Sequence, residues 1–354
     1  MSEPVDPTDD GSAAPSLPPV APHPGALEAL EQKLLGARPH LTQEEVAEQA
    51  GITLDVARHL WHLLGFAHTA PGEVAFTDAD VHALRLTSDL IGMGVLSQDR
   101  QDGLVRTWGR SFARLAEWEV ALLGDIAAES GADPTDGLLA IADEVLPRVE
   151  ALQTYAWRRH LLSAGSRLIA ERESGSASTL AVCFVDIVGY TSQSRALTDR
   201  ELVSWLEAFE SAVLGITVDR GARIIKNIGD ELLLVADDPA QMAEIALELT
   251  ARGADEDDLF PAVRAGVAYG EVVTRLGDVF GPVVNIAARL TSVARPNTVL
   301  VDRGMHEALS EAGPGDEPDP EPEAASYRLR RLRRVSVKGY SRLHVWCLQQ
   351  PRSA

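Results

Sequence analysis

The chain has 354 residues, 45% of them hydrophobic, and a formal net charge of −21. Its length and composition indicate a globular protein of two domains, and its acidity opposes binding to nucleic-acid phosphates, so nucleic acid is not expected as a partner. No run approaches the roughly 18 apolar residues of a membrane span, and the opening MSEPVDPTDDGSAAPSLPP is unlike a signal peptide, so we expect a cytoplasmic protein without a membrane span.

The first part of the chain changes from a polar tail to a helical pattern. Residues 1–25 are rich in proline, serine and acidic residues and have no apolar period, which predicts a disordered tail. Apolar residues at helical spacing then predict an all-α domain over residues 26–145. Thr42, followed three residues later by Glu45, has the spacing of a capping box, and Thr53 and Thr77 are expected to be further N-caps.

Residues 146–178 are expected to connect this domain to the rest of the chain. Apolar residues between Leu152 and Leu168 follow a helical pattern, which predicts a connector helix. The Gly/Ser-rich break at residues 174–178 predicts a flexible joint after it.

From Thr179 onward, predicted strands and helices alternate. LAVCFVDIV is typical of a buried strand, RELVSWLEAFESAVLGITVDRG of a long helix, and RIIKNIGDELLLV of a hairpin. Residues 179–350 are therefore expected to form an α+β domain with a mixed sheet and flanking helices. Cys183 and Cys347 lie in apolar runs without a Cys-x-x-Cys motif, so we expect buried thiols.

Three acidic residues, Asp186, Asp230 and Asp278, lie at the ends of predicted strands. Carboxylates from neighbouring strands are the ligands that Mg²⁺ requires, with phosphate oxygens and water completing its shell. Gly189 would let backbone N–H groups approach a phosphate closely. The alternative is that each acid belongs to a surface turn, as expected of many acids in so acidic a chain.

Two further pairs of polar residues have spacings that suit nucleotide chemistry. Asn285 and Arg289 are four residues apart on a predicted helix, so they share one face, where they could orient a hydroxyl and stabilise charge on phosphorus. Lys226 and Asp278 could read the exocyclic amine and ring nitrogen of adenine. The alternatives are a surface arginine paired with an acid and a simple ion pair.

Together, FVDIVGYT, KNIGDE and GDVFGPVVNIAARL resemble, in order and spacing, the catalytic domain of class III adenylyl cyclases, over about half of the chain. The resemblance implies that Asp186, Ile187 and Asp230 form the metal site and that Asn285 and Arg289 act in the transition state. It also implies that Lys226 and Asp278 select adenine, and thus ATP, because guanylyl cyclases typically carry Glu and Cys at these two positions. Lys338, in SVKGY, matches a family lysine that contacts the triphosphate.

The family implies an adenylate cyclase that converts ATP to 3′,5′-cyclic AMP and pyrophosphate with two Mg²⁺ or Mn²⁺ ions per site. It also implies a homodimer, in which the aspartates of one copy meet the Lys/Asp and Asn/Arg pairs of the other. One alternative is a nucleotide-binding regulator without turnover. Another alternative is a DNA-binding helix-turn-helix at TQEEVAEQAGITLDVARHLWHLLGF, although Arg58 is the only Lys or Arg of its second helix.

The domain order resembles that of actinobacterial cyclases in which a helical N-terminal domain inhibits the catalytic domain, some of them responding to acidity. We therefore expect residues 146–170 to switch between helix and coil. His160, beside Arg158 and Arg159, is a candidate pH sensor, with a plain solvated residue as the alternative.

Overall fold

The computed structural model describes residues 26–93, 98–129, 134–174, 179–255, 257–311, 327–332 and 343–350. The chain divides into two compact units, Met1–Leu161 and Leu162–Ala354. Within the described ranges, no helix has both the length and the hydrophobicity that crossing a bilayer requires. The expected tail, residues 1–25, and most of the expected joint, residues 175–178, lie outside these ranges.

The first unit is a helical domain with a small strand pair. Its elements are α1 (Ala26–Leu35), β1 (Leu41–Thr42), α2 (Gln43–Ala50), α3 (Leu54–Leu64), β2 (Val74–Phe76), α4 (Asp78–Gly92), α5 (Gln98–Glu129) and the first part of α6 (Pro134–Ser174). The strands β1 and β2 pair antiparallel. The apolar faces of the helices meet in one core, which includes Val46, Leu60, Trp61, Val81 and Val105.

Side-chain caps begin the helices of this unit where the sequence predicts them. Thr42 and Glu45 form the expected capping box at the start of α2, and Thr77 forms another at the start of α4. Thr53 caps α3. Each cap gives a partner to backbone N–H groups that the first helical turn leaves unpaired.

Helix α6 is longer than the expected connector. It begins at Pro134 and runs on through Pro147 to Ser174, so the segment expected to connect the domains is the C-terminal part of a longer helix. A proline inside a helix removes one backbone hydrogen bond, so the continuation of α6 through Pro147 does not follow from local preference.

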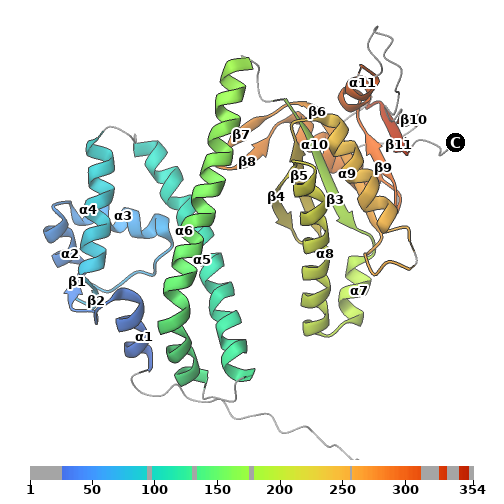
Figure 1. The fold of residues 1–354 in the computed structure, drawn as a ribbon. Coiled ribbons are helices and arrows are strands. Elements are labelled where there is room, and N and C mark those ends of the chain that lie inside the picture. Colours follow the sequence, from blue (N-terminus) through green and yellow to red (C-terminus); the bar gives the residue numbers. More distant parts are fainter. Residues whose placement is uncertain are drawn as a thin grey trace, which may run out of the picture. The chain divides into compact units, whose positions relative to one another are not determined.

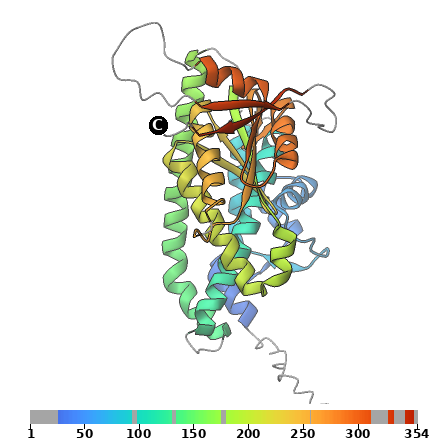
Figure 2. The ribbon, with the colours of Figure 1, turned by 90° about the vertical axis from the view of Figure 1, so that its right-hand side faces the viewer.

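The second unit is built on a seven-stranded mixed sheet. Its strands are β3 (Thr179–Ile187), β4 (Arg223–Ile228), β5 (Glu231–Ala236), β6 (Val263–Glu271), β9 (Val299–Val301), β10 (Arg328–Leu332) and β11 (Val345–Gln349). They lie in the order β10-β11-β9-β6-β3-β5-β4, and only the described pair β6–β9 is parallel. Figures 1 and 2 show this sheet from two directions, with β10 and β11 in red. The predicted α+β fold is confirmed.

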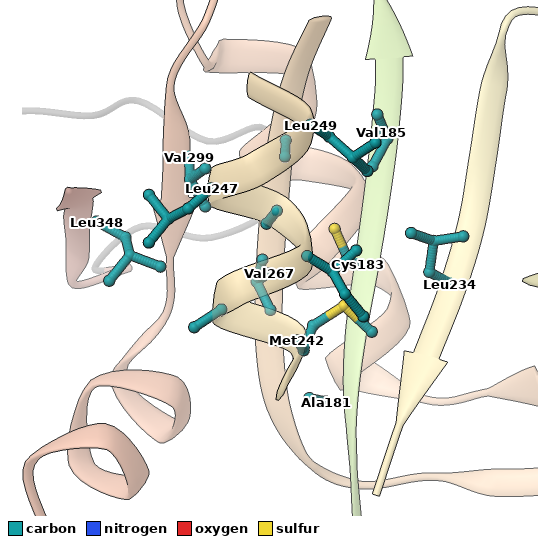
Figure 3. Close-up of a cluster of buried hydrophobic side chains, with 14 of the residues drawn as sticks. Ala181, Cys183, Val185, Leu234, Met242, Leu247, Leu249, Val267, Val299 and Leu348 are labelled. Atoms are coloured by element: carbon teal, nitrogen blue, oxygen red, sulfur yellow. The ribbon is translucent and has the colours of Figure 1, made fainter. Parts of the chain in front are cut away.

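Helices cover both faces of the sheet. Alternate residues of a strand face opposite sides, so β3 contributes Cys183 and Val185 to one face and Val182 and Phe184 to the other. The first face packs against α8 (Asp199–Asp219), α9 (Pro239–Arg252) and α11 (Arg303–Glu311). Figure 3 shows side chains of α9 lying over the strands at this face. Cys183 and Cys347 are free and buried, as expected, and burial raises the pKa of the Cys183 thiol.

The opposite face carries α10 (Pro282–Val293) and the hairpin of β7 (Val273–Arg275) and β8 (Asp278–Phe280). Helix α10 lies directly against the sheet at Gly266 of β6. A Cβ atom there would be 2.3 Å from the nitrogen of Thr291 and 2.5 Å from the carbonyl oxygen of Ala287. The Thr291 hydroxyl also donates to the carbonyl of Phe184 on β3 at 3.2 Å. This helix can therefore approach the sheet only because residue 266 has no side chain.

Candidate active site

The face that carries α10 also carries a row of charged residues across three strands. Asp186 of β3 lies opposite Glu231 of β5 and opposite Arg264 of β6. Its side chain is 14% exposed and forms an ion pair with Arg264, whose Nε and Nη2 lie 2.6 and 2.5 Å from Asp186 Oδ2. This two-point contact fixes the orientation of the Asp186 carboxylate.

Asp230 lies in the turn between β4 and β5, beside Asp186. Gly229 makes this turn with a φ of 66°, in the left-handed region that glycine favours. Burial raises the pKa of Asp230, and the charge of Asp186 raises it further. The turn is tied to the end of β3, because the N–H of Ile187 donates to the carbonyl of Asp230 at 3.4 Å.

The same crowding affects Glu231. Burial, then the charges of Asp186 and Asp230, raise the pKa of Glu231 to about 7. The carboxylates of Asp186, Asp230 and Glu231 thus lie close together in a partly buried site, where Arg264 offsets part of their negative charge. Such a surplus of hard oxygen donors fits a divalent cation.

The described side chains do not enclose a metal ion by themselves. Among the described residues, no three side chains of the metal-binding types come close enough to enclose an ion alone. Mg²⁺ is commonly held by one or two carboxylates with phosphate oxygens and water, which Asp186 and Asp230 could provide for. The Ile187 side chain is buried in the core on the opposite face, so only its backbone carbonyl could contribute.

The structure brings Lys226 and Asp278 together from positions far apart in the sequence. Lys226 Nζ lies 2.5 Å from Asp278 Oδ2, and both side chains are partly exposed. The other carboxylate oxygen of Asp278 accepts from the N–H of Val279, and Lys226 Nζ lies 6.0 Å from the centre of the Phe280 ring. A donor and an acceptor are thus held side by side next to an aromatic ring.

Asn285 and Arg289 are both exposed on the outer face of α10, while Ala287 and Leu290 pack inward. Neither exposed side chain has a hydrogen bond or an ion pair with another described residue. The alternative in which Arg289 pairs with a surface acid therefore finds no support in the described part of the chain. The Asn285 amide and the Arg289 guanidinium could therefore bind a ligand or a second copy of the chain.

Of the two remaining predicted site residues, the structure describes Gly189 but not Lys338. Gly189 precedes α7 (Tyr190–Ala196) with a φ of 76°, and its carbonyl accepts from the N–H groups of Ser192 and Gln193. This glycine therefore forms the turn between β3 and α7, beside Asp186. Lys338 lies outside the described residues.

Arg264 and Glu231 are members of the site that the sequence analysis missed. Glu231 was seen in the hairpin, but its proximity to Asp186 depends on strand register. The signal for Arg264 was a charged residue inside the apolar strand AVRAGVAYG, which places it on the opposite face from Val263 and Ala265.

The raised pKa of Glu231 predicts a pH-dependent cost to folding. A carboxyl group whose pKa rises from 4.5 to about 7 on folding lowers stability progressively as pH rises through that range. In metal-free buffer with a chelator, Glu231→Gln should therefore raise the free energy of unfolding by about 1–2 kcal/mol at pH 8, after allowance for partial exposure, and by much less at pH 5. Chemical denaturation at both pH values measures this, with the exposed Glu207→Gln on α8 as control. An equal effect of Glu231→Gln at pH 5 and pH 8 would contradict it.

Comparisons with known proteins identify the family of the chain. Residues 173–350 match the family model of the adenylate and guanylate cyclase catalytic domain. An adenylate cyclase of Glutamicibacter nicotianae is 37% identical over 77% of this chain and 73% of its own length. An adenylate cyclase of Streptomyces coelicolor is 38% identical over 85% of this chain and 80% of its own. A pH-sensitive adenylate cyclase of Mycobacterium tuberculosis is 30% identical over 83% and 78%. The chain therefore belongs to the class III adenylyl cyclase family.

Proposed function

We propose that the protein converts ATP into 3′,5′-cyclic AMP and pyrophosphate, in the cytoplasm, at sites shared by two copies of the chain. The observation that carries this proposal is the pair Lys226–Asp278, held at 2.5 Å, with Asp278 on the strand that leads into α10. The exposed face of that helix carries Asn285 and Arg289. Relatives named adenylate cyclase that align with most of the chain support the same activity.

The base and the ribose would each have their own partners. Lys226 would donate to an adenine ring nitrogen while Asp278 accepts from the exocyclic amine, which requires their mutual ion pair to open. Asn285 would orient the ribose so that its 3′-oxygen faces the α-phosphorus.

The remaining residues would act on the phosphates. Two Mg²⁺ or Mn²⁺ ions, held by Asp186, Asp230 and the carbonyl of Ile187, would offset the triphosphate charge and lower the pKa of the 3′-hydroxyl. The 3′-hydroxyl would lose its proton to water, a phosphate oxygen or Asp186, and its oxygen would form a bond to the α-phosphorus as the bond to pyrophosphate breaks. Arg289 would donate to the charge that develops there. Lys338 and the backbone near Gly189 would contact the other phosphates. On a chain of net charge −21, such local cations are needed to retain a polyanion.

Sharing the site between two copies is consistent with the pairing inside one chain. Asp186 has its partner in Arg264, whereas Asn285 and Arg289 have none among the described side chains. A second copy could bring its own Asp186 and Asp230 to face them. A homodimer has two such sites by symmetry.

Incubation of the purified protein with ATP or GTP and Mn²⁺, followed by mass analysis, tests this function. We expect a product with the mass of cyclic AMP, pyrophosphate in equal amount, and much less product from GTP. Binding of ATP without pyrophosphate release would instead favour the nucleotide-binding regulator. The DNA-binding alternative is disfavoured, because Arg58 is engaged within the first unit by Gln43 and Glu44.

We further propose that the helical N-terminal domain, residues 26–145, inhibits the catalytic domain, residues 179–350, through residues 146–178, and that acidity modulates this. The name of the pH-sensitive relative supports it, and His160 is exposed on α6. A fragment that begins at Ser174 should then be more active than the full chain, by a factor that depends on pH. Equal specific activity of the two proteins from pH 5 to pH 8 would remove the inhibitory role, and His160→Gln would show whether this residue sets the dependence.

A further inference from the structure

Arg264 is held in place beside the candidate metal ligands, although no motif of the site includes it. It lies on β6 directly opposite Asp186 of β3, the neighbouring strand in the sheet (Figure 1). Its Nε and Nη2 both donate to the same carboxylate oxygen, Asp186 Oδ2, at 2.6 and 2.5 Å. Its remaining nitrogen, Nη1, donates to the carbonyl of Ser292 in the last turn of α10 at 3.4 Å. These contacts with a strand and a helix fix the position of the guanidinium charge.

The charge of Arg264 acts on all three carboxylates of the site. Besides its contact with Asp186, it affects Asp230 and Glu231. Burial raises the pKa of both of these acids, and the charge of Arg264 offsets part of this rise. The side chains of Asp186 and Arg264 are 14% and 33% exposed, so solvent screens their charges only in part. Removal of Arg264 would therefore leave three partly buried carboxylates without this neighbouring cation.

A divalent cation and the guanidinium of Arg264 would compete for the Asp186 carboxylate. Its Oδ2 already accepts two charge-assisted hydrogen bonds, and a metal ion bound by Asp186 would be repelled by the fixed positive charge beside it. The described side chains also do not enclose an ion by themselves. The phosphates of a nucleotide would supply both further oxygen ligands and further negative charge. The metal ion is thus favoured when the nucleotide is present and opposed when it is absent.

We propose that Arg264 is a positioning residue that keeps the affinity of this site for free metal ions low, so that a metal ion binds firmly only together with a nucleotide. The proposal rests on the metal site proposed above at Asp186 and Asp230. A merely structural role of Arg264 predicts the opposite effect of its removal. Loss of a structural contact would free the Asp186 side chain and weaken metal binding, whereas loss of a competing charge strengthens metal binding.

Titration of the full chain with Mn²⁺ in the absence of nucleotide, at pH 8 and about 0.15 M salt, tests this role. The electron paramagnetic resonance of free Mn²⁺ measures the binding. We expect a dissociation constant above about 1 mM for the unmodified chain and binding at least about tenfold tighter for Arg264→Gln. Arg264→Lys keeps the positive charge, so its affinity should stay close to that of the unmodified chain.

Two further variants locate the effect in this site. Arg264→Gln combined with Asp186→Asn should lose the gain in affinity, because the ligand itself is removed. Arg220→Gln is the matched control. It removes a guanidinium that is 30% exposed and pairs with Glu244 and Glu248 in the same unit, so it should leave Mn²⁺ binding unchanged. Thermal unfolding shows whether each variant folds, and if Arg264→Gln does not, Arg264→Met, which keeps an apolar stem, provides the same test.

Several results would overturn the proposal. Unchanged or weaker Mn²⁺ binding in Arg264→Gln would show that the charge of Arg264 does not limit metal affinity, as would an equal gain in Arg264→Lys. A gain that persists with Asp186→Asn would place the ion elsewhere. A dissociation constant below about 0.1 mM for the unmodified chain without nucleotide would contradict the proposal without any variant. Since the titration needs neither ATP nor turnover, its outcome is separate from the test of cyclic AMP formation.

Discussion

Mixing the Asp186→Ala and Arg289→Ala variants is expected to restore cyclic AMP formation that neither variant supports alone. If the proposed sites are shared, the mixed dimer contains one site that lacks both groups and one site that retains both. Each variant by itself has the same defect in both of its sites. Loss of a transition-state donor such as Arg289 typically lowers the rate on the order of 10²–10³.

The expected recovery follows from random exchange. When equal amounts of the two variants exchange subunits, half of the dimers are mixed and each has one intact site, so about a quarter of the original activity should return. Cyclic AMP formation at saturating ATP and Mn²⁺ measures it.

The matched control for this mixture combines Arg289→Ala with Asn285→Ala. Both residues lie on the same face of α10, so their defects come from the same side of a site and no dimer should have an intact site. Failure of the Asp186→Ala and Arg289→Ala mixture to recover activity, with both variants folded and exchanging subunits, would contradict the shared site.

Replacing Lys226 by Glu and Asp278 by Cys is expected to shift nucleotide preference from ATP toward GTP. In the resemblance described above, Glu and Cys stand at these positions in guanylyl cyclases. The double change reverses the donor and acceptor pattern presented to the base, so ATP would leave these polar groups without partners. We expect kcat/KM for ATP to fall on the order of 10²-fold, with a smaller fall or a rise for GTP.

Measuring kcat/KM for both nucleotides separates base recognition from general damage. Arg200→Glu makes the same reversal of charge as Lys226→Glu, at an exposed position of α8, and should leave the ratio unchanged. If the double variant lost activity with both nucleotides by the same factor, Lys226 and Asp278 would have a structural role only, as the simple ion pair that the sequence left open.

The parts of the fold that local sequence patterns determine were predictable. The caps at Thr42, Thr53 and Thr77 follow from short-range spacing, and the alternation along β3 follows from its apolar run. The start of α6 was not predictable in this way, since the helix runs on through Pro147, a residue type that local patterns associate with helix boundaries.

Residues of the candidate site were predictable only where they belong to a recognisable sequence motif. Lys226 and Asp278 are separated by 52 residues, yet they were expected together and lie in contact. Arg264 was missed because its contact with Asp186 depends on the register of β3 against β6, which no local pattern in either strand determines.

The close packing of α10 against the sheet at Gly266 limits how the enzyme could be regulated. A helix whose backbone rests on the strand beneath it, with no side chain between them, cannot tilt or slide without a steric clash. Any movement of Arg289 therefore requires movement of the whole seven-stranded sheet together with α10. If the proposed sites are shared by two copies, an inhibitory signal that displaces Arg289 would move one catalytic unit as a whole against the other, and the hinge of that motion would lie outside this unit.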